Sequence, residues 1–177
     1  ATTVEAASRR TIWVDYEDSR LTDTAVSTIV SSTNGVPIVV ERAMWWPGGP
    51  ASWHEVHASA GAVAPAARWA LAEGAIDARA PGDTYLLVAN VGTRGDEVAF
   101  TVAFEDRPPL EHRVRVPPGT RFTLDVRQAF PEAAGRRFGA LVSSSDGTPL
   151  VVEAATYADA DGVKWASGSN LLATPLP

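Results

Sequence analysis

The stretch Glu97–Glu105, which reads EVAFTVAFE, decides the fold class. Large apolar residues stand at every second position, and alanine, threonine or glutamate stands between them. Side chains of a β-strand point alternately to its two faces, so this pattern predicts a strand with one buried and one solvated face. Such strands are typical of antiparallel sheets.

The same period of two continues on either side of this stretch. Leu110–Val116 and Arg121–Arg127 alternate in the same way, and proline- and glycine-rich turns separate the segments. Further strands are predicted at 11–17, 25–32, 36–46, 52–58, 67–72, 84–91, 138–144, 149–157 and 163–168, with one short helical turn within 127–134. Many short strands at steady spacing predict an all-β, antiparallel, immunoglobulin-like sandwich.

Composition narrows the classes of protein to which the chain can belong. The 177 residues carry a net charge of −6, and the basic residues are scattered, which argues against nucleic-acid binding. Cysteine is absent, so the chain has no disulfide framework or thiol nucleophile. No apolar run approaches the ~18 residues of a membrane-spanning helix, so we expect no membrane insertion. No motif of the chain calls for a cofactor, and we expect none. Because the first residue is Ala1, we expect a processed chain or a piece of a longer one.

An internal repeat is the strongest single signal. Residues 8–65 align without a gap on residues 120–177 at a constant offset of 112, with 14 of 58 positions identical and nine of these within Val30–Ala43. In each copy an Asn-Gly or Asp-Gly pair follows one apolar strand and precedes another. Such pairs favour the positive-φ turns of antiparallel hairpins.

The repeat predicts the domain organisation. Residues 8–65 form a first half-repeat, and 66–177 form a complete sandwich unit with a middle segment, 66–119, and the second copy, 120–177. One compact domain overall is the alternative. A half-repeat alone cannot bury its apolar face, so we expect the first copy to pack on the rest of the chain or on another molecule.

Three motifs in series resemble a known family. They are Ile38–Trp46 (IVVERAMWW), Arg68–Gly74 (RWALAEG) and Asp83–Asn90 (DTYLLVAN). They look like the "VVERAMYW … W-LAEG … TYLLLANP" tandem repeats of bacterial secreted and cell-surface proteins of unknown function. The resemblance implies extracellular β-sandwich modules with no enzymatic activity attached to the motifs. The second copy departs from the pattern, because it reads VVEAATYA.

Trp45, Trp46 and Trp53 are the best candidate binding residues. Adjacent residues of a strand point to opposite faces, so one of Trp45 and Trp46 is expected in the core and the other at the surface. An exposed tryptophan can stack on a sugar ring or anchor a protein interface. The alternative is that all three cover the open end of the sandwich.

Three acidic or basic residues are predicted to have structural roles. Glu41 and Glu153 hold equivalent positions inside apolar strands, where a carboxylate needs a partner such as Arg42. Paired carboxylates also serve glycoside hydrolases, which is a remote alternative. The sequence His54-Glu55-Val56-His57 raises a metallohydrolase as another, but histidines three apart on a strand point to opposite faces.

Asp159 and Asp161 stand in an Asp-Ala-Asp-Gly turn and are weak calcium candidates. A hairpin turn that uses Asp-Gly is the favoured explanation, and the first copy, which has Gly48-Gly49-Pro50 at this place, carries no carboxylate there.

The sequence therefore predicts a non-catalytic structural or adhesive module of a bacterial secreted or cell-surface protein. It would act through module packing or edge-strand pairing with neighbouring modules or with itself. A carbohydrate-binding module that uses the exposed tryptophans is the competing interpretation.

Overall fold

The computed structural model describes residues 1–22, 24–49, 52–76, 82–160 and 162–177, without the side chains at 46–49, 52–55, 160 and 164. Two compact units divide the chain, Ala1–Ser31 and Ser32–Pro177. The repeat instead predicts a boundary at 65/66, and the limits of the half-repeats remain a prediction.

The first unit, Ala1–Ser31, contains short helical turns. They are α1 (Val14–Glu17) and η1 (Ser19–Leu21), and the Asp18 side chain caps the second by accepting from the Arg20 backbone N–H at 2.9 Å. The strands predicted at 11–17 and 25–32 are absent from the described residues of this unit. A strand needs a hydrogen-bonded neighbour, and the alternation of residues in these segments does not supply one.

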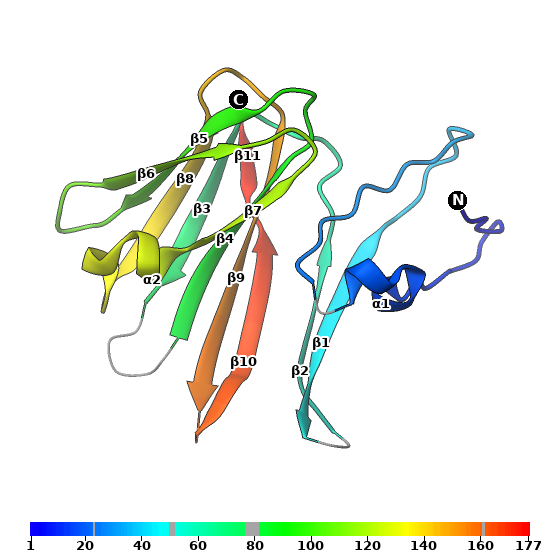
Figure 1. The fold of residues 1–177 in the computed structure, drawn as a ribbon, viewed down its shortest axis with the longest axis horizontal. Helices are drawn as coiled ribbons and strands as arrows, with labels where there is room; N and C mark the ends of the chain where they lie inside the picture. Colours follow the sequence, from blue (N-terminus) through cyan, green and yellow to red (C-terminus); the bar gives the residue numbers. More distant parts are fainter. Residues whose placement is uncertain (23, 50–51, 77–81, 161) are drawn as a thin grey trace. The chain divides into compact units, whose positions relative to one another are not determined.

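The second unit contains a two-sheet sandwich (Figure 1). One sheet has the order β10-β9-β4-β7, and the other has the order β11-β3-β8-β5-β6. The strands are β3 (Arg68–Ala75), β4 (Gly82–Asn90), β5 (Asp96–Ala103), β6 (Leu110–Val116), β7 (Arg121–Asp125), β8 (Arg137–Ser144), β9 (Leu150–Ala160), β10 (Val163–Leu172) and β11 (Thr174–Leu176). All the strand pairs of the two sheets are antiparallel, which confirms the predicted all-β, antiparallel class.

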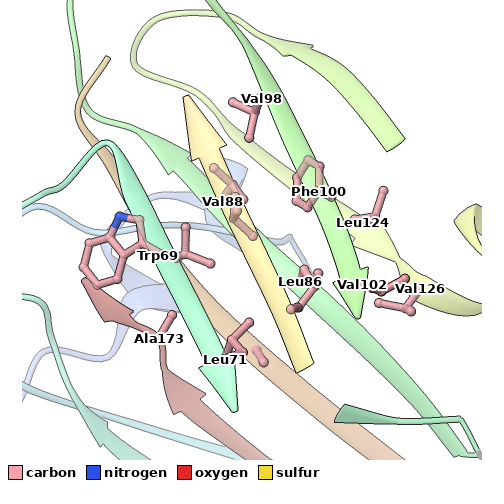
Figure 2. Close-up of a cluster of buried hydrophobic side chains, with 14 of the residues drawn as sticks. Trp69, Leu71, Leu86, Val88, Val98, Phe100, Val102, Leu124, Val126 and Ala173 are labelled. Carbon is pink, nitrogen blue, oxygen red and sulfur yellow. The ribbon is translucent and has the colours of Figure 1, made fainter. Parts of the chain in front are cut away.

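The core lies between the two sheets and follows the period of two. In β5, Val98, Phe100 and Val102 are fully buried, as the alternation predicts. Figure 2 shows side chains of β3 and β4 gathered with those of β5, among them Trp69, Leu86 and Val88. The Trp69 indole N–H also donates to the carbonyls of Ala66 and Leu150, each at 3.0 Å, so its one polar atom is satisfied within the core.

Short helices close one connection of the sandwich. α2 (Val126–Ala129) follows β7, and η2 (Pro131–Ala133) leads toward β8, within the range where the sequence predicts a helical turn. The Asp125 side chain caps α2 by accepting from the Gln128 backbone N–H at 3.1 Å.

A separate hairpin precedes the sandwich strands. It consists of β1 (Glu41–Gly49) and β2 (Ser52–Ala60), and it forms a two-stranded sheet of its own. Glu41 pairs with Ala60 and Trp45 with Val56, whereas in the β9–β10 hairpin Glu153 pairs with Leu172 and Tyr157 with Gly168. Each of these pairs maps on its counterpart at the offset of 112, so the two hairpins have the same register.

Candidate functional site

The outer face of the four-stranded sheet gathers charged and aromatic side chains. Register alternation places Asp83 and Tyr85 of β4 on this face, across from Tyr157 and Ala155 of β9. Glu153 of β9 lies on the same face, opposite Leu87. This arrangement sets polar groups on a sheet whose other face is the core.

Arg42, Arg121 and Glu153 form the charged part of this face. Arg42 Nη1 lies 3.2 Å from Glu153 Oε2, so an ion pair joins the β1–β2 hairpin to the sheet. Burial lowers the pKa of Arg121, and the Arg42 guanidinium nearby lowers it further, while Glu153 raises it. The half-buried Glu153 carboxylate therefore pairs with Arg42 and offsets only part of the cost of holding the Arg121 cation at this face.

A second contact joins the hairpin to the sheet. The Asn170 side-chain N–H of β10 donates to the Ser59 hydroxyl at 3.1 Å, and Ser59 is the register partner of Arg42. The hairpin thus lies against this sheet with the face that carries Arg42 and Ser59.

The aromatic part of the site is a stack at the β9–β10 end. The rings of Tyr157 and Trp165 are stacked with centroids 4.9 Å apart, and Tyr85 meets Tyr157 edge-on at 5.9 Å. Trp165 has φ of +55°, a conformation that L residues adopt at some cost, and Asp159 accepts from its backbone N–H at 2.7 Å. Burial is the main cause that raises the pKa of Tyr157, which keeps this phenol neutral.

Of the three tryptophans predicted to bind a ligand, the structure describes the side chain of one. Trp45 is half-buried in β1, while the side chains of Trp46 and Trp53 lie outside the described residues. At the offset of 112, Tyr157 and Trp165 are the equivalents of Trp45 and Trp53. The repeat therefore relates Trp45 and Trp53 to the stacked pair, although the tryptophans predicted to bind lay only in the first copy.

The two glutamates predicted to have equivalent roles have different surroundings in the structure. Glu153 is half-buried and pairs with Arg42, whereas Glu41, expected to be partly buried, is exposed. The reason is its position: Glu41 begins a two-stranded sheet, while Glu153 has a strand on each side of it. Asp159 caps the backbone at Trp165, and Asp161 lies outside the described residues. Within the described ranges, no three His, Asp or Glu side chains cluster in a way that could hold a metal ion.

A polar network at the other end of the sandwich was not foreseen. Asp96 is buried at the start of β5 and accepts from the hydroxyls of Ser144 and Ser145, the latter at 2.9 Å. Nearby, a shallow hollow is lined by residues of two turns, 91–94 and 147–149. The serines thus hold a buried carboxylate, and isolated polar residues of this kind give no spacing signal in a sequence.

Exposed apolar residues concentrate in the first copy. Between Val36 and Val40 the chain exposes a run of branched aliphatic side chains, and Val39 is 92% exposed. The run is Val36, Ile38, Val39 and Val40. We call residues 36–40, which belong to the second unit, the aliphatic segment. Monomeric proteins rarely leave large contiguous apolar surface in water, so such a segment is typical of an interaction site.

Comparisons with known proteins bear on the fold. No protein-family model matches the chain, and no curated protein matches it. Among solved structures the chain is similar to "Crystal Structure of Thermotoga maritima 1070", with a TM-score of 0.56 and 16% identity over 63% of this chain and 96% of that one. It is also similar to "Anabaena sensory rhodopsin transducer", with a TM-score of 0.43 and 23% identity over 50% of this chain and 93% of that one. In the described residues no helix is long and apolar enough to cross a membrane. The likeness to the Thermotoga maritima structure supports the all-β fold and extends to nothing else.

Proposed function

We propose that the chain is a non-catalytic interaction module of a bacterial secreted or cell-surface protein, and that it binds protein through the aliphatic segment. The observation that carries the proposal is the exposure of this segment, because burying it against a partner removes apolar area from water. The family resemblance of the three sequence motifs supports the extracellular setting.

Packing of apolar side chains fits this module better than strand addition at β6. That edge strand carries Glu111, Arg113 and Arg115, and Arg113 pairs with Glu97 at 3.1 Å and with Glu111 at 2.7 Å. Charged side chains on an edge strand oppose pairing with a foreign strand.

Sedimentation velocity of the chain over about 1 to 200 µM tests the proposal, since this range spans weak protein association. We expect self-association that grows with concentration and is lost in the double variant Val36→Lys, Val39→Lys. Val63→Lys is the matched control, because Val63 is fully exposed but lies outside the aliphatic segment. A chain that stays monomeric throughout, with the same hydrophobic-dye binding in all three proteins, would contradict the proposal.

A second candidate function is glycan binding at the stacked pair. Trp165 is 37% exposed and stacks on Tyr157, so the pair offers an aromatic surface to a sugar ring. The positive φ of Trp165 is a backbone conformation that occurs often at ligand sites. A glycan array, with tryptophan fluorescence as the second readout, tests this function. We expect binding that Trp165→Ala abolishes and Trp69→Phe leaves intact, and silence on the array with unchanged fluorescence would remove it.

A further inference from the structure

The first copy carries the core pattern of the second copy without its burial. In the second copy the side chains of Leu124, Phe138, Val142, Leu150 and Val152 are at most 4% exposed. The residues 112 positions earlier are all aliphatic: Ile12, Val26, Val30, Ile38 and Val40. Yet Ile12 is 48% exposed, Val30 51%, Ile38 45% and Val40 39%.

Sheet topology explains why the second copy is buried. β7 and β9 both pair with β4, and β8 pairs with β3 and β5, so all three have their neighbours in the middle segment 66–119. That segment also supplies the core facing them, including Trp69, Leu86 and Phe100. Among the strand pairs described, β9 with β10 is the one formed entirely within the second copy.

The first copy has the structure that this topology predicts for a half without its middle segment. Its described strand pair, β1 with β2, is the equivalent of β9 with β10 and has the same register. The equivalents of β7 and β8, residues 9–13 and 25–32, form no strand. The pairing that the half makes by itself is present, and the pairings that need a middle segment are not.

A second copy of this chain does not offer a vacant middle segment. β4 lies between β9 and β7, β3 between β11 and β8, and β5 between β8 and β6. Each central strand of 66–119 is therefore already paired on both sides by its own chain.

We propose that residues 8–65 are a half-sandwich that binds a protein segment with the strand pattern of residues 66–119, one that has no 120–177-like half of its own. This inference rests on the proposed function, since the aliphatic segment remains the binding surface, and it names a partner other than the second copy of this chain with which that function is tested. On binding, Ile12, Val30, Ile38 and Val40 enter a second core, and residues 9–13 and 25–32 become strands. This core differs from the first at several positions, three of which become polar: Asp18, Thr28 and Arg42 replace Phe130, Ala140 and Ala154.

The test supplies the partner in the order that the repeat predicts. A fusion repeats residues 66–119 directly ahead of Ser8 in the chain, and hydrogen exchange is followed at residues 26–40. We expect these amides to be protected by at least about 100-fold relative to the unfused chain, as for the strands of a folded unit. The matched control carries Leu86→Asp and Val88→Asp in the added copy only, and it should show no protection.

A pair of substitutions gives the test a second readout. In the unfused chain Val40→Asp should leave the denaturation midpoint unchanged, since the side chain is 39% exposed, whereas Val152→Asp should abolish folding. In the fusion, Val40→Asp should remove the protection at 26–40. Equal exchange at 26–40 in fused and unfused chains overturns the inference.

The two proposals fail separately. A chain that self-associates through the aliphatic segment, with a fusion that shows no protection, retains the proposed function and refutes the half-sandwich. Protection of residues 26–40 in a monomeric fusion supports the half-sandwich. An unfused chain that stays monomeric at every concentration refutes the self-association that we expect from the proposed function.

Discussion

Replacing Asn90 with aspartate should destabilise the sandwich strongly, and in a pH-dependent way. Asn90 ends β4 and is 1% exposed. Its Nδ2 donates to the carbonyls of Arg94 at 2.9 Å and Val116 at 3.0 Å, and its Oδ1 accepts from the Gly92 backbone N–H at 2.9 Å. One side chain thus joins the turn after β4 to the end of β6.

The size of the effect follows from these three bonds. Asn90→Asp keeps the shape and the acceptor toward Gly92 but loses both donors. Each lost hydrogen bond removes about 1 kcal/mol, and each buried carbonyl left without a donor adds a desolvation cost of similar size. A carboxylate beside two carbonyl oxygens is further penalised, so we expect a loss of roughly 3 to 5 kcal/mol at pH 7.

The sign of the pH dependence provides a second check. Burial and the two carbonyls favour the protonated form, so the pKa of the introduced carboxyl is higher in the folded than in the unfolded chain. The folded state then binds the proton more tightly, and the protonated group can donate to one carbonyl. The deficit relative to the natural chain should therefore be smallest near pH 4 and grow as pH rises from about 3.9 to the raised pKa.

Urea unfolding of the two proteins at several pH values measures both effects. Asn34→Asp is the matched control: its Oδ1 accepts from the Val36 backbone N–H at 3.2 Å in an exposed turn, and Asp146 holds the equivalent position in the second copy. We expect its cost to be near zero. A loss below about 1 kcal/mol for Asn90→Asp, or a deficit that does not change with pH, would refute the reasoning.

Three further predictions concern other parts of the sandwich. Gly74→Ala places a Cβ against the Phe138 ring in the core and should cost about 1–3 kcal/mol by chemical denaturation, partly recovered by Phe138→Leu. Gly139→Ala, whose Cβ meets a carbonyl at 3.4 Å, should cost less. Burial is the largest cause that raises the pKa of Tyr85 and Tyr157, so alkaline absorbance titration should show phenols that ionise late, and Tyr85→Phe or Tyr157→Phe should each remove one. Because the folded state holds these protons longer, their contribution to stability should fall as pH rises past about 10. Arg42→Gln should cost no more than about 1 kcal/mol, because Arg42 is 41% exposed, and a double-mutant cycle with Glu153→Gln should show a coupling that salt reduces.

The sandwich strands could be predicted because their signals are local. Alternation in β5 and the turn glycines Gly119 and Gly147, which have positive φ, are properties of a few consecutive residues. The sequence did not reveal β11, since Thr174–Leu176 contains a proline and is too short to alternate. It forms because β3 has an open side there, which depends on residues about a hundred positions away.

The strands predicted at 11–17 and 25–32 show the limit of such signals. These segments have the composition of β7 and β8, but β7 and β8 are strands because β4, β3 and β5 lie beside them. The buried polar residues that fix the turns were hidden for a related reason. Asn90 and Asp96 are single polar residues in apolar strands, and their role depends on Val116 and Ser144, which only the fold brings near.

Arg42 connects the present structure of the first copy with the partner that we propose for it. Its equivalent, Ala154, faces the core, so Arg42 and its register partner Ser59 lie on the hairpin face that a completed second sandwich would turn inward. That face now contacts Glu153 at 3.2 Å and Asn170 at 3.1 Å. The hairpin therefore cannot keep these contacts and bury the same face in a new core. The ion pair and the hydrogen bond each contribute about 1 kcal/mol. Fully burying an exposed aliphatic side chain contributes about 1.5–3 kcal/mol, and Ile38 and Val40, which are 45% and 39% exposed, would each gain roughly half of that. Burying Arg42 opposes this gain, so displacement of the hairpin from the sheet requires a partner that also buries Ile12 and Val30 and pairs the guanidinium.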